Sequence, residues 1–103
     1  MTEQEFRLRA DQTLEDLQQQ LLPLADESDI EVDLRNGVLQ LVFEEPAPAK
    51  FVISPNAPVQ QIWVSALSRS FKLGWSDDAA TFELNGEHLY TLVERLARQH
   101  LGT

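Results

Sequence analysis

The carboxylates of this 103-residue chain are concentrated in one segment. Residues 11–33 include no lysine or arginine, and they contain eight acidic residues: Asp11, Glu15, Asp16, Asp26, Glu27, Asp29, Glu31 and Asp33. Carboxylate oxygens suit hard cations such as Mg²⁺, Ca²⁺, Mn²⁺ and ferrous or ferric iron. Because no histidine or cysteine joins them and no spacing encloses an ion as an EF-hand loop does, we expect weak, water-mediated binding with little selectivity.

The spacing of these carboxylates places them on two expected elements. Asp11 and Glu15 are one helical turn apart with Asp16 beside them, and Glu31 and Asp33 share one face of an expected strand. If that strand is the sheet edge nearest the helix, the two groups merge into one anionic ridge. The alternative is a solvated surface whose charges protect an edge strand from aggregation. Composition alone gives the two interpretations equal weight.

Trp63 is the second position that could carry function. Ile62 and Val64 point toward an expected core, which leaves Trp63 on the opposite face between Gln61 and Ser65. An exposed tryptophan at the centre of a sheet is typical of an anchor for a protein partner. The alternative is that the strand is bulged or that neighbouring side chains screen the indole.

No active site is predicted. His88 and His100 lie on the expected last helix, and no serine or carboxylate is spaced to form a relay with them. The four glycines are dispersed, so none of them builds a phosphate-binding loop. The chain contains no cysteine, which excludes disulfide, thiolate and cysteine–metal chemistry. We therefore expect a protein that is not an enzyme.

Length and composition define the class of protein. A chain of 103 residues suffices for a single domain, spanning residues 1–103, and 43% hydrophobic residues is ordinary for a globular fold. The net charge of −9 argues against nucleic acid and favours cations or a basic protein surface as partners. No apolar run approaches the roughly 20 residues of a membrane span, and no signal or transit peptide is recognised. We expect a cytoplasmic protein.

The elements that position these residues follow from apolar spacing. Steps of three and four predict an amphipathic helix over residues 3–24, ended by Pro23 and the acidic stretch after it. Strict alternation then predicts two strands joined at a tight Asn36-Gly37 turn. A last helix follows Asn85-Gly86 and ends near Gly102. The six expected strands cover residues 30–34, 38–44, 50–54, 60–66, 71–75 and 81–84.

Together these elements predict an α+β fold, a two-layer sandwich with two terminal helices on one face of an antiparallel sheet of about six strands. Short connections require antiparallel pairing, and two amphipathic helices can cover only one face of such a sheet. The other face must stay in water. Its expected members are Glu31, Asp33, Gln40, Val42, Gln61, Trp63, Ser65 and Lys72.

Several features of the sequence, taken together, are similar to those of a known protein family. They are the helix–strands–helix order with an acidic first helix and strand, Glu5-Phe6, Ala10-Asp11-Gln12, Ser28-Asp29-Ile30, Asn36-Gly37-Val38-Leu39 and Gln61-Ile62-Trp63-Val64-Ser65. In these features the chain resembles the frataxin family, and its bacterial branch most closely. The resemblance covers nearly the whole chain, and the segment around Trp63 is its most specific part.

The resemblance implies an iron-binding accessory protein of iron–sulfur cluster assembly that docks on the cysteine desulfurase and its scaffold protein. It implies weak, labile iron binding at a ridge of Asp11, Asp29, Glu31 and Asp33, with Glu15, Asp16, Asp26 and Glu27 nearby. It also implies a partner-binding set: Gln61, Trp63, Ser65, Lys72, Glu31 and Asp33. Residues 18–23 lack carboxylates that the family usually has, and Ala79-Ala80-Thr81 replaces a second aromatic. Without carboxylates in residues 18–23, the acidic ridge is thinner than the ridge that the family usually has.

Two other classes of protein share some of these features. An acidic secretion chaperone is also a small, anionic α+β protein-binding module, but such chaperones are usually dimers with large apolar patches, whereas we expect a monomer. A metal-storage or ferroxidase protein is disfavoured because the acidic segment has no histidine and no enclosed site.

Overall fold

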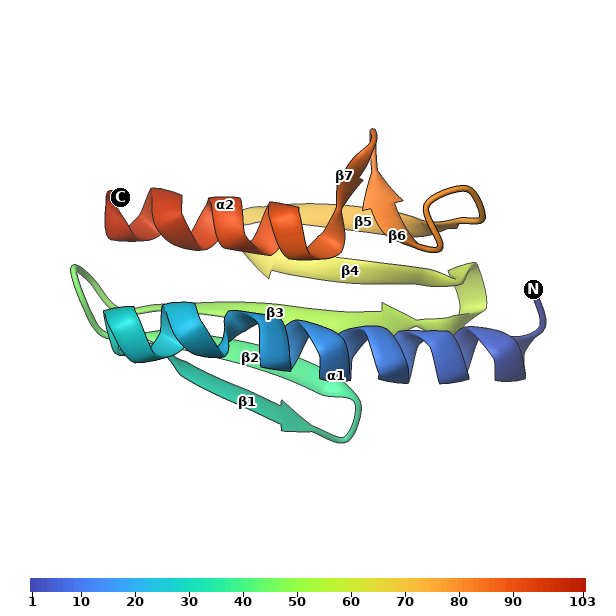
Figure 1. Cartoon of the computed structure of the whole chain (residues 1–103), viewed down its shortest axis with the longest axis horizontal. Helices are drawn as coiled ribbons and strands as arrows, with labels where there is room; N and C mark the ends of the chain where they lie inside the picture. Colours follow the sequence, from blue (N-terminus) through green and yellow to red (C-terminus); the bar gives the residue numbers. More distant parts are fainter.

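Two helices lie side by side across one face of an antiparallel sheet, and no element covers the opposite face (Figure 1). The computed structural model describes all residues, 1–103. The strands follow one another in the sheet in chain order, from β1 to β7. The elements are α1 (Glu3–Ser28), β1 (Glu31–Arg35), β2 (Val38–Phe43), β3 (Ala49–Asn56), the 3-10 turn η1 (Ala57–Val59), β4 (Gln61–Ala66), β5 (Arg69–Ser76), β6 (Thr81–Leu84), β7 (Glu87–His88) and α2 (Leu89–Leu101). The expected α+β sandwich is confirmed, with seven strands where about six were predicted.

Helix α1 begins as the sequence requires but ends later than predicted. A capping box joins Thr2 and Glu5 at its start. The prediction that Pro23 ends the helix is wrong, because α1 continues to Ser28 with Pro23 inside it. An interior proline costs about 3 kcal/mol, but Leu24 and Ala25 beyond it are buried in the core. The helix ends instead at Asp29, whose left-handed backbone lets the N–H of the next residue, Ile30, donate a 3.1 Å hydrogen bond to the Ala25 carbonyl.

Tight turns fix the register of the sheet. Asn36 and Gly37 both have positive φ, of 52° and 76°, and form the predicted hairpin turn between β1 and β2. Leu67 and Ser68 adopt the same left-handed conformation between β4 and β5, at a pair of residues that gives no hairpin signal in the sequence. The turn at Asn85 does not lead straight into the last helix. It leads into β7, the additional strand.

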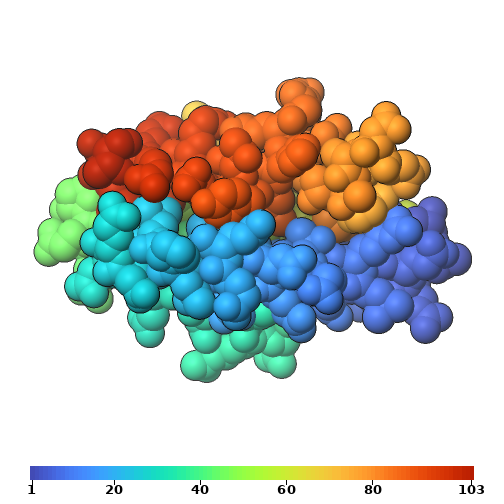
Figure 2. All heavy atoms as spheres, viewed as in Figure 1, coloured from blue at the N-terminus to red at the C-terminus, as the bar shows by residue number.

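The core lies between the sheet and the two helices, which hide most of the sheet in the space-filling view but leave the hairpin of β1 and β2 visible beside α1 (Figure 2). All 23 buried residues are apolar. Strands β2 and β4 alternate buried and accessible residues, as predicted, and Ile62 and Val64 point inward. Phe6 of α1 meets Phe82 of β6 edge-on, with ring centroids 5.8 Å apart. This contact fixes α1 against the half of the sheet that lies under α2.

Helix α2 is tied to β7 by an ion pair. His88 was expected on the last helix, but it ends β7 and precedes the first helical residue, without a capping hydrogen bond from its side chain. Instead Arg95 donates two hydrogen bonds, of 2.8 and 2.9 Å, to the two carboxylate oxygens of Glu87. The hydrogen bond from Arg95 lowers the pKa of Glu87.

Replacing Glu87 should lower stability in a pH-dependent way. Because the pKa of Glu87 is lowered in the folded chain, its contribution is present above the carboxyl pKa of the unfolded chain, about 4.3, and is lost as pH falls through the lower folded value. We expect Glu87→Gln to lose about 0.5–1 kcal/mol at pH 7 by urea unfolding, and the difference to be smaller at pH 3. Glu27→Gln, at an exposed carboxylate without an ion pair, should lose nothing. A loss at Glu87 that is the same at both pH values would contradict this assignment.

Candidate functional site

Trp63 lies on β4, the middle strand of the seven, on the face that the helices leave uncovered. Its neighbours across the sheet are Ser54 on β3 and Lys72 on β5. The indole is 37% exposed, whereas Ile62 and Val64 on either side of it in the chain are buried. The predicted alternation is therefore confirmed, and the strand continues through Trp63 without a bulge.

The indole is held in place from two sides. Its Nε1–H donates a 2.9 Å hydrogen bond to Oε1 of Gln61, two residues earlier on the same face. The ammonium group of Lys72 lies 4.9 Å from the ring centroid, within the range of a cation–π contact. Ser65 is exposed two residues further along β4 and is paired with Ser70. Gln61, Trp63, Ser65 and Lys72 thus share one face.

The other predicted contact residues, Glu31 and Asp33, lie on β1 at the edge of the sheet. Their cross-strand partners are Val42 and Gln40, so both acids belong to the uncovered face. Arg35, two residues after Asp33 on the same face, contacts its carboxylate at 3.0 Å. This pairing partly neutralises Asp33, which leaves Glu31 as the unpaired acid of the strand.

The carboxylates of α1 are divided between two sides of the helix. Asp11 and Glu15 line a hollow of about 250 Å³ together with Leu34 and Gly37, at the turn between β1 and β2. An added Cβ on Gly37 would lie 3.7 Å from Oδ1 of Asp11, so the helix and the turn are close neighbours here. Asp16 does not line this hollow.

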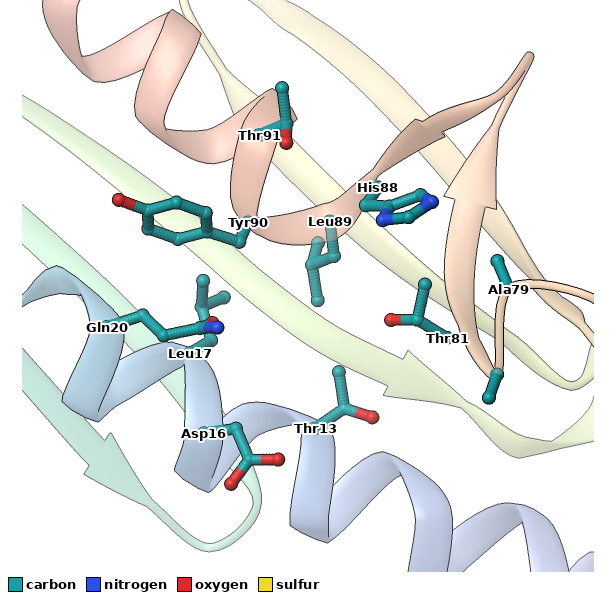
Figure 3. A pocket seen from close by; sticks show the side chains of 11 residues that line it. Thr13, Asp16, Leu17, Gln20, Ala79, Thr81, His88, Leu89, Tyr90 and Thr91 are labelled. Atoms are coloured by element: carbon teal, nitrogen blue, oxygen red, sulfur yellow. The ribbon is translucent and has the colours of Figure 1, made fainter.

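Asp16 instead lines a hollow of about 280 Å³ between α1, the start of α2 and residues 79–81 (Figure 3). Its carboxylate accepts a 2.9 Å hydrogen bond from Gln12. His88 and Tyr90 also line this hollow. The Tyr90 hydroxyl donates a 3.0 Å hydrogen bond to Glu94, and this bond raises the pKa of Tyr90.

A larger acidic hollow, of about 430 Å³, lies at the other end of β1. Asp29 and Glu31 line it together with Glu44 and Glu45, which the sequence analysis did not include among the candidate ligands. The hairpin register could have revealed them, because pairing Glu31 with Val42 brings residues 44 and 45 beside residue 29. Asp26 and Glu27 are exposed on the last turns of α1 and line neither hollow.

The hollows at the two ends of β1, together with β1 itself, define what we call the acidic edge. Its residues are Asp11, Glu15, Asp29, Glu31, Asp33, Glu44 and Glu45. No three histidine, aspartate or glutamate side chains are placed to hold one metal ion. The donor set fits hard cations in chemistry but not in arrangement, since a direct site needs several oxygens at one point. The acidic edge can therefore attract cations through its field, with water between ion and carboxylate.

His100 has a structural position at the far end of α2. Its Nε2 lies 2.8 Å from the carbonyl oxygen of Ala47, and its ring meets Phe43 edge-on at 4.9 Å. The side chain thus links the last helical turn to the loop between β2 and β3.

Neither helix is long and apolar enough throughout to cross a membrane.

Comparison with known proteins gives consistent matches. Residues 1–103 match a sequence model of the frataxin-like domain family. A Pseudomonas fluorescens (strain Pf0-1) protein, named iron-sulfur cluster assembly protein CyaY, is 28% identical over 94 aligned residues, covering 87% of this chain and 84% of that protein. A solved structure, described as frataxin from Psychromonas ingrahamii as a model to study stability modulation within the CyaY protein family, covers 96% of this chain and 90% of its own, with a TM-score of 0.73 and 24% identity. At that identity the structure supports the fold alone.

The two tryptophans should differ sharply in their effect on stability. Trp63 is on the uncovered face, whereas Trp75 packs against Phe82 with ring centroids 5.2 Å apart and lies under Arg9 of α1. We expect Trp63→Ala to change the free energy of unfolding by less than about 1 kcal/mol and Trp75→Ala to lower it by at least about 2 kcal/mol. Urea titration followed by circular dichroism measures both. Equal losses would mean that Trp63 supports the fold rather than a contact surface.

Proposed function

The chain belongs to the frataxin-like family, and from this premise we propose that it is an accessory protein of iron–sulfur cluster assembly that acts by docking and not by catalysis. The observation that carries the proposal is Trp63, an indole held on the uncovered sheet face by Gln61 and Lys72. A tryptophan fixed in one orientation loses little conformational freedom on binding, so more of its contact energy remains for affinity. The name of the P. fluorescens relative supports the choice of pathway.

The proposed partners are the cysteine desulfurase and its scaffold protein, in the cytoplasm. The chain carries a net charge of −9, and much of it lies along the acidic edge and α1. Such a field steers a basic surface toward the protein and repels nucleic acid. We propose that the acidic edge sets the approach of a basic patch on the desulfurase and that Trp63 provides the short-range contact.

Iron is proposed as a weakly held cargo. The carboxylates of the acidic edge are spread over two hollows, an arrangement that favours exchangeable, water-mediated ions over a closed site. Iron at these carboxylates would reduce the same negative field that steers the partner. Docking would then respond to the supply of iron.

A secretion chaperone fits the molecule less well. Large exposed apolar side chains on α1 are Leu8 and Leu22, which are 14 residues and hence about 21 Å apart along the helix. Trp63 lies on the opposite layer of the molecule. These positions do not make the extended apolar surface that an unfolded client requires, and we propose a monomer.

Trp63 and the acidic edge should contribute to binding in different ways. Trp63→Ala should weaken binding to the purified desulfurase–scaffold complex by about 2 kcal/mol or more, mainly through faster dissociation. The pair of changes Glu31→Gln and Asp33→Asn should mainly slow association and flatten its salt dependence, while stability stays level or rises slightly. Association and dissociation rates measured by surface plasmon resonance at several salt concentrations separate the effect of Trp63 from that of the acidic edge. Failure of the unchanged protein to bind either partner would overturn the proposed function.

Ferrous iron should affect the acidic edge selectively. Under anaerobic conditions, iron should broaden the amide NMR signals of Asp11, Glu15, Asp29, Glu31 and Asp33, together with Glu44 and Glu45. The effect should weaken as salt rises past about 0.1 M, because exposed charges are then strongly screened. Mg²⁺ or Ca²⁺ at higher concentration should displace part of it. Broadening centred on His88 or His100 would contradict the assignment.

A further inference from the structure

The two lysines of the chain, Lys50 and Lys72, both lie on the uncovered sheet face. Lys72 is paired across the sheet with Trp63, and Lys50 with Val42, whose other partner is Glu31. Neither lysine contacts a carboxylate within 4.0 Å.

Most of the arginines, by contrast, pair with carboxylates. Four of them, Arg7, Arg35, Arg95 and Arg98, form ion pairs with carboxylates, and Arg9 and Arg69 lie over aromatic rings. Lys72, like Lys50, Arg9 and Arg69, therefore has no carboxylate partner, although the chain carries a net charge of −9. It gives the surface around the indole a local charge opposite to that of the acidic edge.

A small hollow lies beside the indole on the same face, which we call the Trp63 hollow. Its volume is about 110 Å³, and it is lined by Val52 and Trp63 and by Ser54, Ser65, Ser70 and Lys72. A hollow of this size, with Val52 and the indole in its lining, suits one aliphatic side chain. Lys72 belongs to its lining, so a carboxylate next to that aliphatic chain would meet an unpaired ammonium group.

We infer that the partner of this face presents an aliphatic side chain flanked by a carboxylate, with the aliphatic chain in the Trp63 hollow and the carboxylate on Lys72. This inference rests on the proposed function and specifies the chemistry of the partner surface. The partner would then be bipolar: acidic opposite Lys72 and basic opposite the acidic edge. Two opposite charges at separate places on one face fix the orientation of docking, which a single sign of charge does not.

Substitutions of Lys72 separate a charge contact from mere support of the indole. Lys72→Met keeps an aliphatic chain against Trp63 but removes the charge, and Lys72→Glu reverses the charge. Against the purified desulfurase–scaffold complex, we expect a loss of about threefold for Lys72→Met and of tenfold or more for Lys72→Glu, mostly in the association rate at low salt. Lys50→Glu, a matched change at the other lysine of the face, should cost less than Lys72→Glu. Equal losses for Lys72→Met and Lys72→Glu would overturn the carboxylate contact.

Filling the hollow tests the aliphatic contact. Ser65→Val adds a β-branched side chain that suits the strand, so the fold should persist in a thermal melt. We expect affinity for the same complex to fall about fivefold or more, because the hollow no longer admits the partner side chain. Unchanged or tighter binding would overturn this half of the inference.

Reciprocal changes give the final control. Replacing single surface aspartates or glutamates of the partner with lysine should identify one that restores binding of Lys72→Glu, and absence of any such rescue counts against the inference. If the unchanged protein binds and Trp63→Ala weakens it, but Lys72→Glu and Ser65→Val bind normally, the inference fails while the proposed function stands. If the unchanged protein does not bind, the proposed function itself fails.

Discussion

Two helices can cover only one face of a seven-stranded sheet, and the rest of the molecule depends on this constraint. Strand residues alternate between the two faces, so each strand has to supply apolar side chains inward and water-compatible side chains outward. The inward side chains and the helical stripes form a core of 23 apolar residues. The outward side chains form the uncovered face, with Trp63 on its middle strand. A large aromatic ring on this face does not contribute to packing in the core. Its presence there therefore indicates a contact with a partner protein.

The distribution of charge follows from the same two layers. Because the core holds no charged residue, all 17 acidic side chains must remain at the surface. Seven of them form the acidic edge, and there Arg35 pairs only with Asp33. The repulsion within this region costs some stability, yet it also protects an edge strand and creates a long-range field. The uncovered face thus combines a negative edge with a positive centre at Lys72, and that combination can orient a partner as well as attract it.

Much of this arrangement can be predicted from the sequence, because it depends on local periodicity. The alternation around Trp63 and the Asn36-Gly37 turn predict the uncovered face and the first hairpin correctly. The end of α1 could not be predicted locally, since burial of Leu24 and Ala25 outweighs the cost of Pro23. The Leu67-Ser68 turn has no sequence signal because neither residue favours positive φ. Glu44 and Glu45 join Asp29 only through strand register, and the position of Asp16 depends on how α1 and α2 pack.

We propose that the uncovered face around Trp63, and not the helical face, meets the partner. The most direct test is to map amide and indole NMR shifts of the full chain on adding the purified desulfurase–scaffold complex. We expect changes at the indole Nε1–H of Trp63 and along the outward residues of β3, β4 and β5, with smaller changes along the β1 edge. Changes confined to α1, α2 and the hollow between them would contradict it, because that face would then be the docking surface.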